Sequence, residues 1–370
     1  MTHPYAGRPE HGFWRFLPKD EWAAVQPALP AKFKVGPQDR IATAGSCFAQ
    51  NLVRRLSERG AQVLVAEPAH EILLPSYAER NGFGVFSARY GNIYTFRQLR
   101  EMIEQAFGLR PVIHDYADDE GKIFDLLRPS VQSAGFFCVE EARADREYHL
   151  TRVREMFETL DVFIFTVGLT ETWVNRSQGH CYPACPGTVR GRYDEQLYAP
   201  VNLTHAQCVA DLEWFLAILR DANPAARLIL TVSPVALVAT HQDQHVLTAT
   251  TYSKSTLRSV CGEAAAADDK IAYFPSYEII ASAASRGIYL ESDLREVTPV
   301  GVDHVMRCFF AAFAAGETAA APAAPAAAAS AAEEALRRQQ MARRLVDADC
   351  DEMFNDAAPA AVTASPPGDR

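Results

Sequence analysis

The chemistry that this sequence suggests begins at Ser46. Residues 41–45 form an apolar run that ends in Gly45, and an amphipathic stretch from about Phe48 to Arg59 follows at once. A serine at such a strand end is presented beside the backbone N–H groups of the next helix, which suits a nucleophile in acyl transfer. The alternative is that Ser46 only caps this helix, and the spacing leaves both interpretations open.

The elements that must position this serine alternate along the chain. Short apolar runs predict strands, and amphipathic stretches predict helices. The expected strands are residues 40–44, 62–66, 161–167, 227–232 and 271–274, and the expected helices are 48–59, 95–107, 139–159, 204–220, 251–265 and 298–313. This alternation predicts an α/β fold with about five parallel strands in a three-layer α/β/α sandwich, flavodoxin-like or Rossmann-like. Sites in such folds lie at the C-terminal ends of the strands.

The composition divides the chain into three parts. Residues 1–37 carry aromatic side chains among polar residues and prolines, and we expect them to pack as an arm on the main domain. Residues 38–314 contain the alternating pattern and form the predicted catalytic domain. Residues 315–370 are rich in Ala and Pro, which predicts a disordered tail with a transient helix at 333–346.

The charge and hydropathy of the chain exclude several classes of protein. The formal net charge is −10 and the pI is about 5.5, which argues against a nucleic-acid partner or an anionic membrane surface. The first residues lack the apolar run of a signal peptide, and no segment is apolar for long enough to span a bilayer. We therefore expect a cytoplasmic protein whose substrate is neutral or sugar-like. No motif for a cofactor is visible.

The cysteines do not indicate a disulfide scaffold or a metal site. Eight cysteines are spread along the chain without dense spacing, so we expect reduced thiols. His180, Cys181 and Cys185 lie close together, but no second pair of ligands accompanies them, and we predict no metal. Cys47 is a rival nucleophile beside Ser46, although we expect its side chain to point into the fold.

Several ordered segments resemble one family of proteins. Residues 45–49 read Gly-Ser-Cys-Phe-Ala, which is the signature of the GSCFA family, and four further blocks follow in the order expected for it. These blocks are residues 90–95, 165–173, 231–235 and 252–258. The resemblance covers roughly residues 38–312. The family in turn resembles the SGNH or GDSL esterases and acyltransferases, which implies an SGNH-like fold and serine-dependent ester chemistry.

The resemblance also implies an oxyanion hole. Proteins of SGNH type build it from the N–H of the serine, a glycine N–H of a second block and an asparagine side chain of a third. In this chain Gly91 and Asn92 are adjacent, and Gly168 stands where the third block is expected, followed by Leu169 instead of asparagine. We therefore assign Gly91, Asn92 and Gly168 to the oxyanion site.

The sequence offers three histidines as the catalytic base. SGNH proteins carry Asp-x-x-His near the end of the domain, whereas here Asp293 is followed three residues later by Glu296. His245 lies in a loop after the fourth predicted strand, on the side of the sheet where sites form, and it ranks first. His304, inside the last predicted helix, ranks second, and His241 ranks third. A branch of the family that has lost its base and only binds is the alternative.

Two further segments carry groups that suit substrate binding. Lys254, expected at a helix start, could bind a carboxylate or phosphate, pair with Glu171, or form a Ser/Lys dyad if its pKa is strongly lowered. Ser253 and Ser255 beside it could simply cap that helix. Glu171 and Trp173, which follow a buried strand, could hydrogen-bond to a sugar ring and stack on it, or cover the edge of the core.

Together these features predict a serine-dependent esterase or O-acyltransferase. Ser46 would form the acyl-enzyme, and a carbohydrate or other hydroxylated compound would be the acceptor. The expected partner is a small-molecule or saccharide ester substrate. The alternative is a binding or scaffolding protein on the same fold, because the Asp-x-x-His motif is missing and a long Ala/Pro tail follows.

Overall fold

Four parallel strands form the central sheet of the chain. The computed structural model describes residues 3–18 and 21–315. The strands lie in the order β1-β4-β8-β9, and every neighbouring pair is parallel. Their bounds are β1 Ile41–Gly45, β4 Val162–Val167, β8 Arg227–Val232 and β9 Ile271–Phe274. All four lie within a residue of the ranges predicted from the apolar runs.

The fifth predicted strand, residues 62–66, is reduced to a single point of pairing. Val63 forms an isolated parallel bridge with Ile41, on the side of β1 that faces away from β4. With this segment included, the spatial order is residues 62–66, β1, β4, β8 and β9. If these five segments are numbered 1 to 5 along the chain, the order is 2-1-3-4-5, as in flavodoxin-like doubly wound sheets. The strand order reverses between β1 and β4, and in such sheets ligands bind beside that point.

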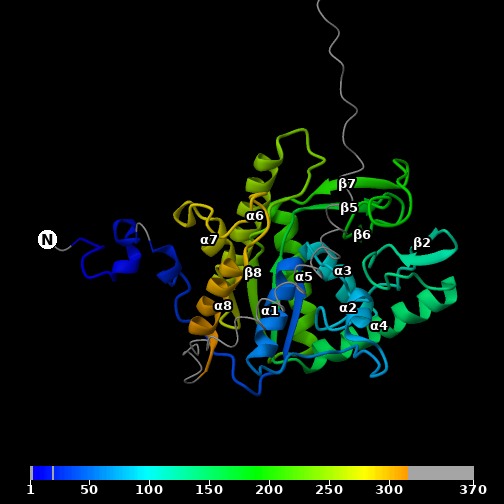
Figure 1. Cartoon of the computed structure of the whole chain (residues 1–370), viewed down its shortest axis with the longest axis horizontal. Helices are drawn as coiled ribbons and strands as arrows, with labels where there is room; N and C mark the ends of the chain where they lie inside the picture. The colour runs from blue at the N-terminus through cyan, green and yellow to red at the C-terminus, as the bar shows by residue number, and fades with distance from the viewer. Residues whose placement is uncertain (1–2, 19–20, 316–370) are drawn as a thin grey trace, which may run out of the picture.

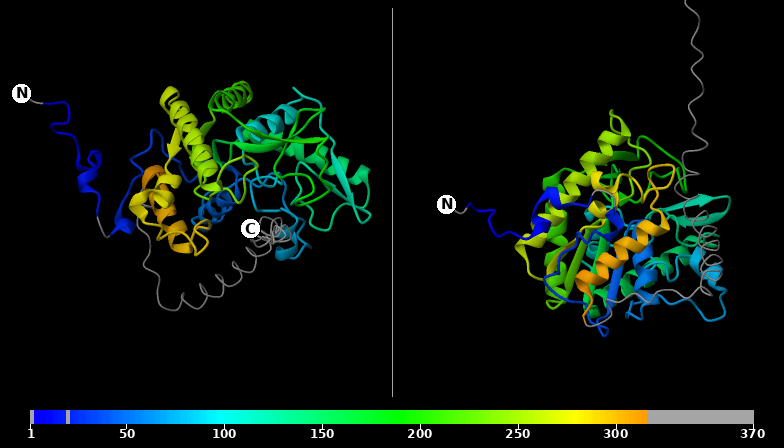
Figure 2. Two further views of the ribbon diagram at one scale, coloured as in Figure 1. Left: turned by 90° about the horizontal axis from the view of Figure 1, so that it is seen from above. Right: turned by 60° about the vertical axis from the view of Figure 1, so that its left-hand side comes forward.

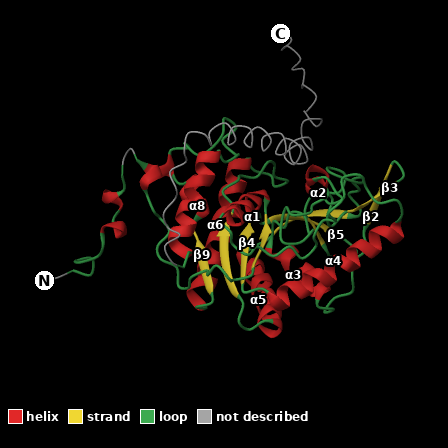
Figure 3. Cartoon of the chain, turned by 60° about the horizontal axis from the view of Figure 1, so that its bottom comes forward, coloured by secondary structure: helices red, strands yellow, loops and turns green. Residues whose placement is uncertain are grey.

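Helices cover both faces of this sheet (Figure 3). One layer contains α1 Cys47–Glu58, α7 Ser276–Ala281 and α8 Pro299–Phe313; the other contains α3 Phe96–Ala106, α4 Val139–Thr159, α5 His205–Ala222 and α6 Val246–Ala267. Side chains of β4 alternate between two hydrophobic cores, because successive residues of a strand point to opposite faces. Phe163 and Phe165 pack against the layer with α3 to α6, whereas Val162 and Ile164 pack against α1 and α8.

Side chains at the helix starts explain why several helices begin where the sequence predicted. Thr95 and Thr204 each form a capping box with the glutamine three residues later, and Thr298 accepts a hydrogen bond from Gly301 N. Helix α6 differs from the prediction, because it begins at Val246 instead of residue 251. Lys254 therefore lies two turns inside α6 and not at its start.

Two antiparallel units were not predicted. The strands β5 Glu171–Asn175, β6 Cys181–Tyr182 and β7 Tyr198–Asn202 form a three-stranded sheet between β4 and α5. The strands β2 Tyr116–Asp119 and β3 Lys122–Asp125 form a hairpin before α4, and the short helix α2 Pro75–Arg80 precedes α3. In Figure 1 these units lie together at one end of the molecule, away from α7 and α8.

The N-terminal arm packs on the domain only in part. Short 3₁₀ helices span Glu10–Gly12, Trp14–Phe16 and Trp22–Ala24, and a fourth spans Ala283–Ser285. Trp22 is buried, and its indole N–H donates to Ile279 O over 2.9 Å, but Trp14 is 77% exposed. The segment before Trp22 lies apart from the sandwich in Figures 1 and 2. The predicted helix at 333–346 lies outside the described residues.

Among residues 3–18 and 21–315, no helix combines the length and the apolar character that a bilayer crossing requires.

A close approach of two backbones fixes the end of β1. Gly45 has a φ of 142°, and a Cβ atom at this position would lie 2.3 Å from Thr166 O of β4. Ser46 N then donates to Thr166 O over 3.1 Å. Only glycine fits here, because any side chain would meet the backbone of the neighbouring strand.

We expect Gly45→Ala to lower the free energy of unfolding by about 3 kcal/mol or more, since the added methyl group must separate β1 from β4. Thermal melting followed by circular dichroism measures the change. Gly36→Ala is the matched control, because its Cβ would meet only Asp39 Oδ2 at 3.7 Å. Equal melting temperatures for the two variants would contradict this account of Gly45.

Candidate active site

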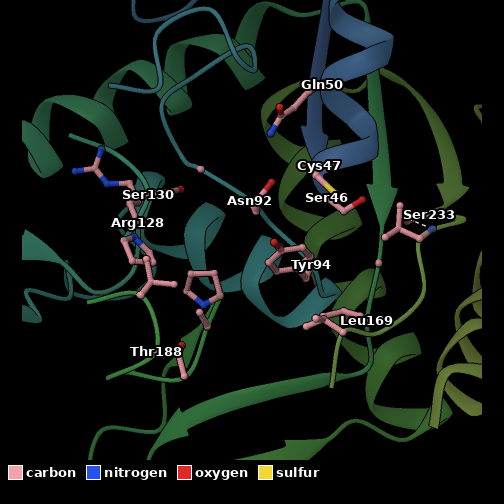
Figure 4. A pocket seen from close by; sticks show the side chains of 18 of the residues that line it. Ser46, Cys47, Gln50, Asn92, Tyr94, Arg128, Ser130, Leu169, Thr188 and Ser233 are labelled. Atoms are coloured by element: carbon pink, nitrogen blue, oxygen red, sulfur yellow. Dashed lines mark hydrogen bonds between the residues drawn. The ribbon is translucent and has the colours of Figure 1, made fainter. Parts of the chain in front are cut away.

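A cavity of about 1150 Å³ opens at the C-terminal ends of β1 and β4. It therefore lies where the strand order reverses, which is the expected place for a ligand. Figure 4 shows Ser46 and Cys47 at the start of α1, with Asn92 and Tyr94 beside them. Further lining residues include Gln50, Gly91, Arg128, Ser130, Gly168, Leu169, Glu171, Trp173, Thr188, Ser233, His241, Lys254 and Arg295.

Ser46 occupies the N-cap position of α1, but its side chain does not cap the helix. The residue is 3% exposed and lines the cavity, and no hydrogen bond from the helix reaches its hydroxyl group. Ser46 Oγ is buried and has no hydrogen-bond partner among the described residues. A capping serine normally accepts a bond from the first turn of its helix. Ser46 therefore stands at the cap position, but capping by its side chain, the alternative interpretation of the sequence, is not observed.

The turn with Gly91 and Asn92 is fixed beside Ser46 by backbone hydrogen bonds. Ile93 N donates to Gly45 O over 2.9 Å, so this turn is attached to the end of β1. Gly91 has a φ of 66°, which favours glycine. Asn92 lines the cavity, and its Oδ1 atom is buried without a partner in the described part of the chain. The structure thus brings Asn92 and Gly91 to Ser46, as predicted.

Gly168 lines the cavity, but it cannot donate the oxyanion bond that we assigned to it. Its N–H group donates to Tyr94 O over 2.9 Å. A Cβ atom on Gly168 would lie 3.4 Å from Ser46 Cβ and 3.4 Å from a ring carbon of Tyr94. Gly168 therefore permits close packing against the serine. The N–H of Ser46 is also engaged, since it donates to Thr166 O.

The two histidines that ranked first as bases do not line the cavity. His245 is exposed and caps α6, where its Nδ1 accepts a hydrogen bond from Leu247 N over 3.1 Å. His304 is buried beneath the N-terminal segment, where Nδ1 bonds to Tyr289 Oη and Nε2 to Val25 O, each over 2.7 Å. Both side chains thus bond to groups outside the cavity.

His241, the third choice, does line the cavity, at its exposed rim. Its backbone N donates to Glu171 Oε2 over 3.3 Å, and its ring packs edge-on against Trp173 at a centroid distance of 5.2 Å. Glu171 Oε1 accepts a second bond from Thr240 Oγ1 over 2.7 Å. Glu171, Trp173 and His241 therefore form one connected rim. Tyr193 also packs edge-on with Trp173, with ring centroids 5.7 Å apart.

Lys254 projects from α6 to the base of the cavity. Its side chain is fully buried, and Nζ donates to Gly168 O over 2.7 Å. Ser253 beside it accepts a hydrogen bond from Thr170 N over 2.9 Å, so α6 holds the segment that follows β4. Burial lowers the pKa of Lys254 from 10.5 to about 7. The pair with Glu171, one of the alternatives left open by the sequence, does not form, since that carboxylate bonds to Thr240 and His241 in the loop after β8.

Three lining residues were not assigned correctly from the sequence. Cys47 is half-buried and lines the cavity, whereas we expected its side chain to point into the fold. Arg295 lies in the segment that should carry Asp-x-x-His, and its Nε donates to Ala236 O over 3.2 Å. The absence of the motif's histidine was the only feature of the sequence that drew attention to this segment. Arg128 had no signal, because an isolated arginine in a loop does not reveal its burial.

The metal prediction concerned His180, Cys181 and Cys185. His180 Nε2 lies 3.2 Å from Asp115 Oδ2, and Cys181 N donates to Glu101 Oε2 over 2.8 Å. Within the residues that the structure describes, no group of three or more His, Cys, Asp or Glu side chains is arranged to hold a metal ion.

A buried hydrogen-bonded pair, Glu67 and His149, supports the turn that carries Asn92. Glu67 Oε2 accepts hydrogen bonds from His149 Nδ1 and from Arg89 N, each over 2.7 Å. The ring of Tyr90 packs edge-on against His149, and its hydroxyl group donates to Thr43 O in β1. Burial would raise the pKa of Glu67, but His149 and the hydrogen bond from Arg89 outweigh it and lower the pKa from 4.5 to about 2.

Arginines and aspartates extend this support beneath the far side of the cavity. Arg128 is 2% exposed and donates to Asp125 Oδ2 over 2.8 Å and to Asp145 Oδ2 over 2.7 Å. Arg89 bonds to the other oxygen of Asp145 over 2.7 Å, and Arg146 bonds to Asp125 over 3.2 Å. Each buried cation thus has a carboxylate partner, as buried charges require.

We expect acid to destabilise the fold partly through Glu67. The pKa of Glu67 is about 2 in the folded chain and near 4.5 when unfolded, so its contribution is complete above pH 4.5 and lost as the pH falls towards 2. Burial also lowers the pKa of His149, which adds to the loss below pH 6.5. Glu67→Gln should cost about 3 kcal/mol at pH 7 and progressively less at acid pH.

Urea unfolding at pH 7 and pH 3 measures this difference. The control is Glu213→Gln on the exposed face of α5, which should change the unfolding free energy by less than about 0.5 kcal/mol at either pH. A Glu67→Gln effect that is the same at both pH values would show that Glu67 is not ionised in the folded chain.

The fold and the site define an α/β protein with an unpartnered serine hydroxyl group at the reversal of a parallel sheet. The model of the GSCFA family matches residues 40–309, which is more than half of the chain. The chain belongs to the GSCFA family, so the resemblance seen in the sequence blocks is confirmed. No curated protein sequence matches the chain.

Proposed function

We propose that this protein is a serine-dependent esterase or O-acyltransferase, in which Ser46 forms an acyl-enzyme and a carbohydrate or other hydroxylated compound accepts the acyl group. The observation that carries the proposal is the hydroxyl group of Ser46, which is buried at the cavity wall without a hydrogen-bond partner in the described residues. An unpartnered buried hydroxyl group costs free energy, and clusters of such groups mark functional sites.

Groups beside Ser46 suit the stabilisation of an oxyanion. Asn92 has a buried carboxamide oxygen without a partner in the described chain, and rotation of the amide group by 180° directs Nδ2 to the same position. The first turn of α1 starts directly after Ser46, and the N-terminus of a helix favours negative charge. We assign the oxyanion to Asn92 and this turn, because the N–H groups of Ser46 and Gly168 are engaged elsewhere.

The walls of the cavity suit an ester with one apolar and one polar part. Apolar side chains that would accommodate an acyl group include Val85, Phe86, Val131, Leu169, Leu237 and Val238. At the rim, Trp173 offers an aromatic side chain beside Glu171, an arrangement that suits the binding of a sugar ring through stacking and hydrogen bonds. The strand order and the position of Ser46 also favour the likeness to SGNH proteins.

We expect Ser46→Ala to abolish covalent labelling by a fluorophosphonate probe. Hydrolysis of p-nitrophenyl acetate and butyrate should fall by about 10²–10⁴-fold, because the acyl-enzyme can no longer form. Intact-mass and peptide mass spectrometry locate the labelled residue, and absorbance measures hydrolysis.

The control is Ser57→Ala, which removes an exposed hydroxyl group at the other end of α1 and should leave both readouts unchanged. Equal labelling of wild type and Ser46→Ala, or no labelling and no turnover by wild type, would reject the nucleophile. The second result would favour the alternative of a protein that only binds, which the position of His245 and His304 outside the cavity also favours.

We expect Asn92→Ala to lower kcat by about 10²–10³-fold with little change in KM, as for loss of one oxyanion donor. The reason is that an oxyanion forms only in the transition state. Steady-state kinetics with p-nitrophenyl butyrate measures both constants. A raised KM with unchanged kcat would instead place Asn92 in ground-state substrate binding.

A further inference from the structure

Lys254 differs from the other buried cations near the site. It is fully buried, and no carboxylate of the described residues lies within ion-pair distance of its Nζ atom. Arg128, on the far side of the cavity, is equally deep but lies between Asp125 and Asp145. An unpaired ammonium group is costly in such a position. Lys254 is therefore poorly suited to hold a permanent charge.

One glycine lies between Lys254 and the proposed nucleophile. The carbonyl oxygen of Gly168 accepts the hydrogen bond from Lys254 Nζ, whereas its Cα packs against Ser46. A methyl group on Gly168 would contact Ser46 Cβ at 3.4 Å. The amine and the hydroxyl group thus adjoin the same residue, and both line the cavity. Neither His245 nor His304 lines it.

We propose that Lys254 Nζ is the general base that removes the proton of the Ser46 hydroxyl group, directly or through one water molecule. This inference rests on the proposed function, and it selects the Ser/Lys dyad from the three alternatives that the sequence left open for Lys254. Burial is the established way to hold a lysine in the neutral form that such a role requires. The single carbonyl acceptor leaves the nitrogen of Lys254 able to turn towards Ser46.

The proton balance of the reaction follows from this assignment. Neutral Lys254 takes the proton from Ser46 Oγ as the Oγ–carbon bond forms, and the carbonyl electron pair moves onto the oxyanion. When the tetrahedral intermediate collapses, the ester bond breaks and the ammonium group of Lys254 protonates the leaving alkoxide. Water or an acceptor hydroxyl group then attacks the acyl-enzyme, gives its proton to Lys254, and Ser46 recovers that proton as it leaves.

The charged and titratable groups around Lys254 come from several elements. Cys47 of α1 raises its pKa, and Arg295 of the segment before α8 lowers it. Glu171 of β5 and His241 of the loop after β8 line the same cavity. Further along α6, Arg258 pairs with Glu278 of α7 over 2.5 Å. His241 is the only histidine in this set, so it must be tested beside Lys254.

The test compares Ser46 labelling by a fluorophosphonate in the full chain and in Lys254→Met, between pH 5.5 and 9. For wild type we expect a labelling rate that rises with pH around a midpoint near 7. Lys254→Met should label about 10²–10⁴-fold more slowly, without this rise. Lys254→Arg should be equally slow, since a guanidinium group stays protonated. Added methylamine should partly restore labelling of Lys254→Ala.

Lys270→Met is the matched control, because Lys270 precedes β9 at the opposite edge of the sheet and is exposed. It should label at the wild-type rate. If Lys254→Met labels Ser46 at the wild-type rate with the same pH profile, Lys254 is not the base. The same conclusion follows if His241→Ala loses the pH dependence while Lys254→Met retains it.

The outcomes separate this inference from the proposed function. Unlabelled wild type rejects Ser46 as the nucleophile, whereas labelled wild type with an unaffected Lys254→Met rejects only the base. Circular dichroism checks that each variant is folded. If Lys254→Met does not fold, the wild-type profile decides, since a labelling rate that is constant between pH 6 and 8 would contradict the proposal.

Discussion

The approach of three backbone segments at the end of β1 is the constraint on which the site depends. Gly45 brings β1 against Thr166 of β4, and Ser46 N is bonded to that strand. Ile93 N bonds to Gly45 O, and Tyr94 O accepts from the residues that follow β4. These contacts involve backbone atoms, so they fix positions without depending on side-chain rotamers. The Ser46 hydroxyl group and the Asn92 carboxamide are held beside each other as a result.

Buried cations on the two sides of the cavity differ in whether they are paired with carboxylates. On the far side, Arg89, Arg128 and Arg146 share Asp125 and Asp145, so each desolvated cation meets an anion. This arrangement makes a rigid support, because removing one member would leave another charge buried and unpaired. Beside Ser46, Lys254 has only a carbonyl acceptor among its recorded hydrogen bonds. Burial without a carboxylate partner lowers the pKa of Lys254 to about 7, whereas the arginines on the far side are paired with carboxylates.

The sequence predicted the parallel sheet and its helices well, because continuous apolar runs such as 162–167 and capping residues such as Thr95 are local signals. The sheet of β5, β6 and β7 was missed, because its strands are short, largely half-buried and separated by turn residues. For the cavity, the sequence blocks predicted that Ser46 and Asn92 lie together, and both line it. Which histidine or lysine faces the cavity could not be predicted, because that depends on the packing of distant segments.

The three-stranded sheet that covers the cavity lies between β4 and α5 and forms no ladder with the parallel strands. It carries Glu171 and Trp173 at the rim, whereas Ser46 and Lys254 belong to the sandwich below. Changes of length or sequence in this insertion therefore leave the hydrogen bonds of the central sheet intact. Under the proposed function, recognition of the substrate at the rim and the chemistry at Ser46 are encoded in separate sheets, so the rim can change in sequence without altering the strands that hold Ser46.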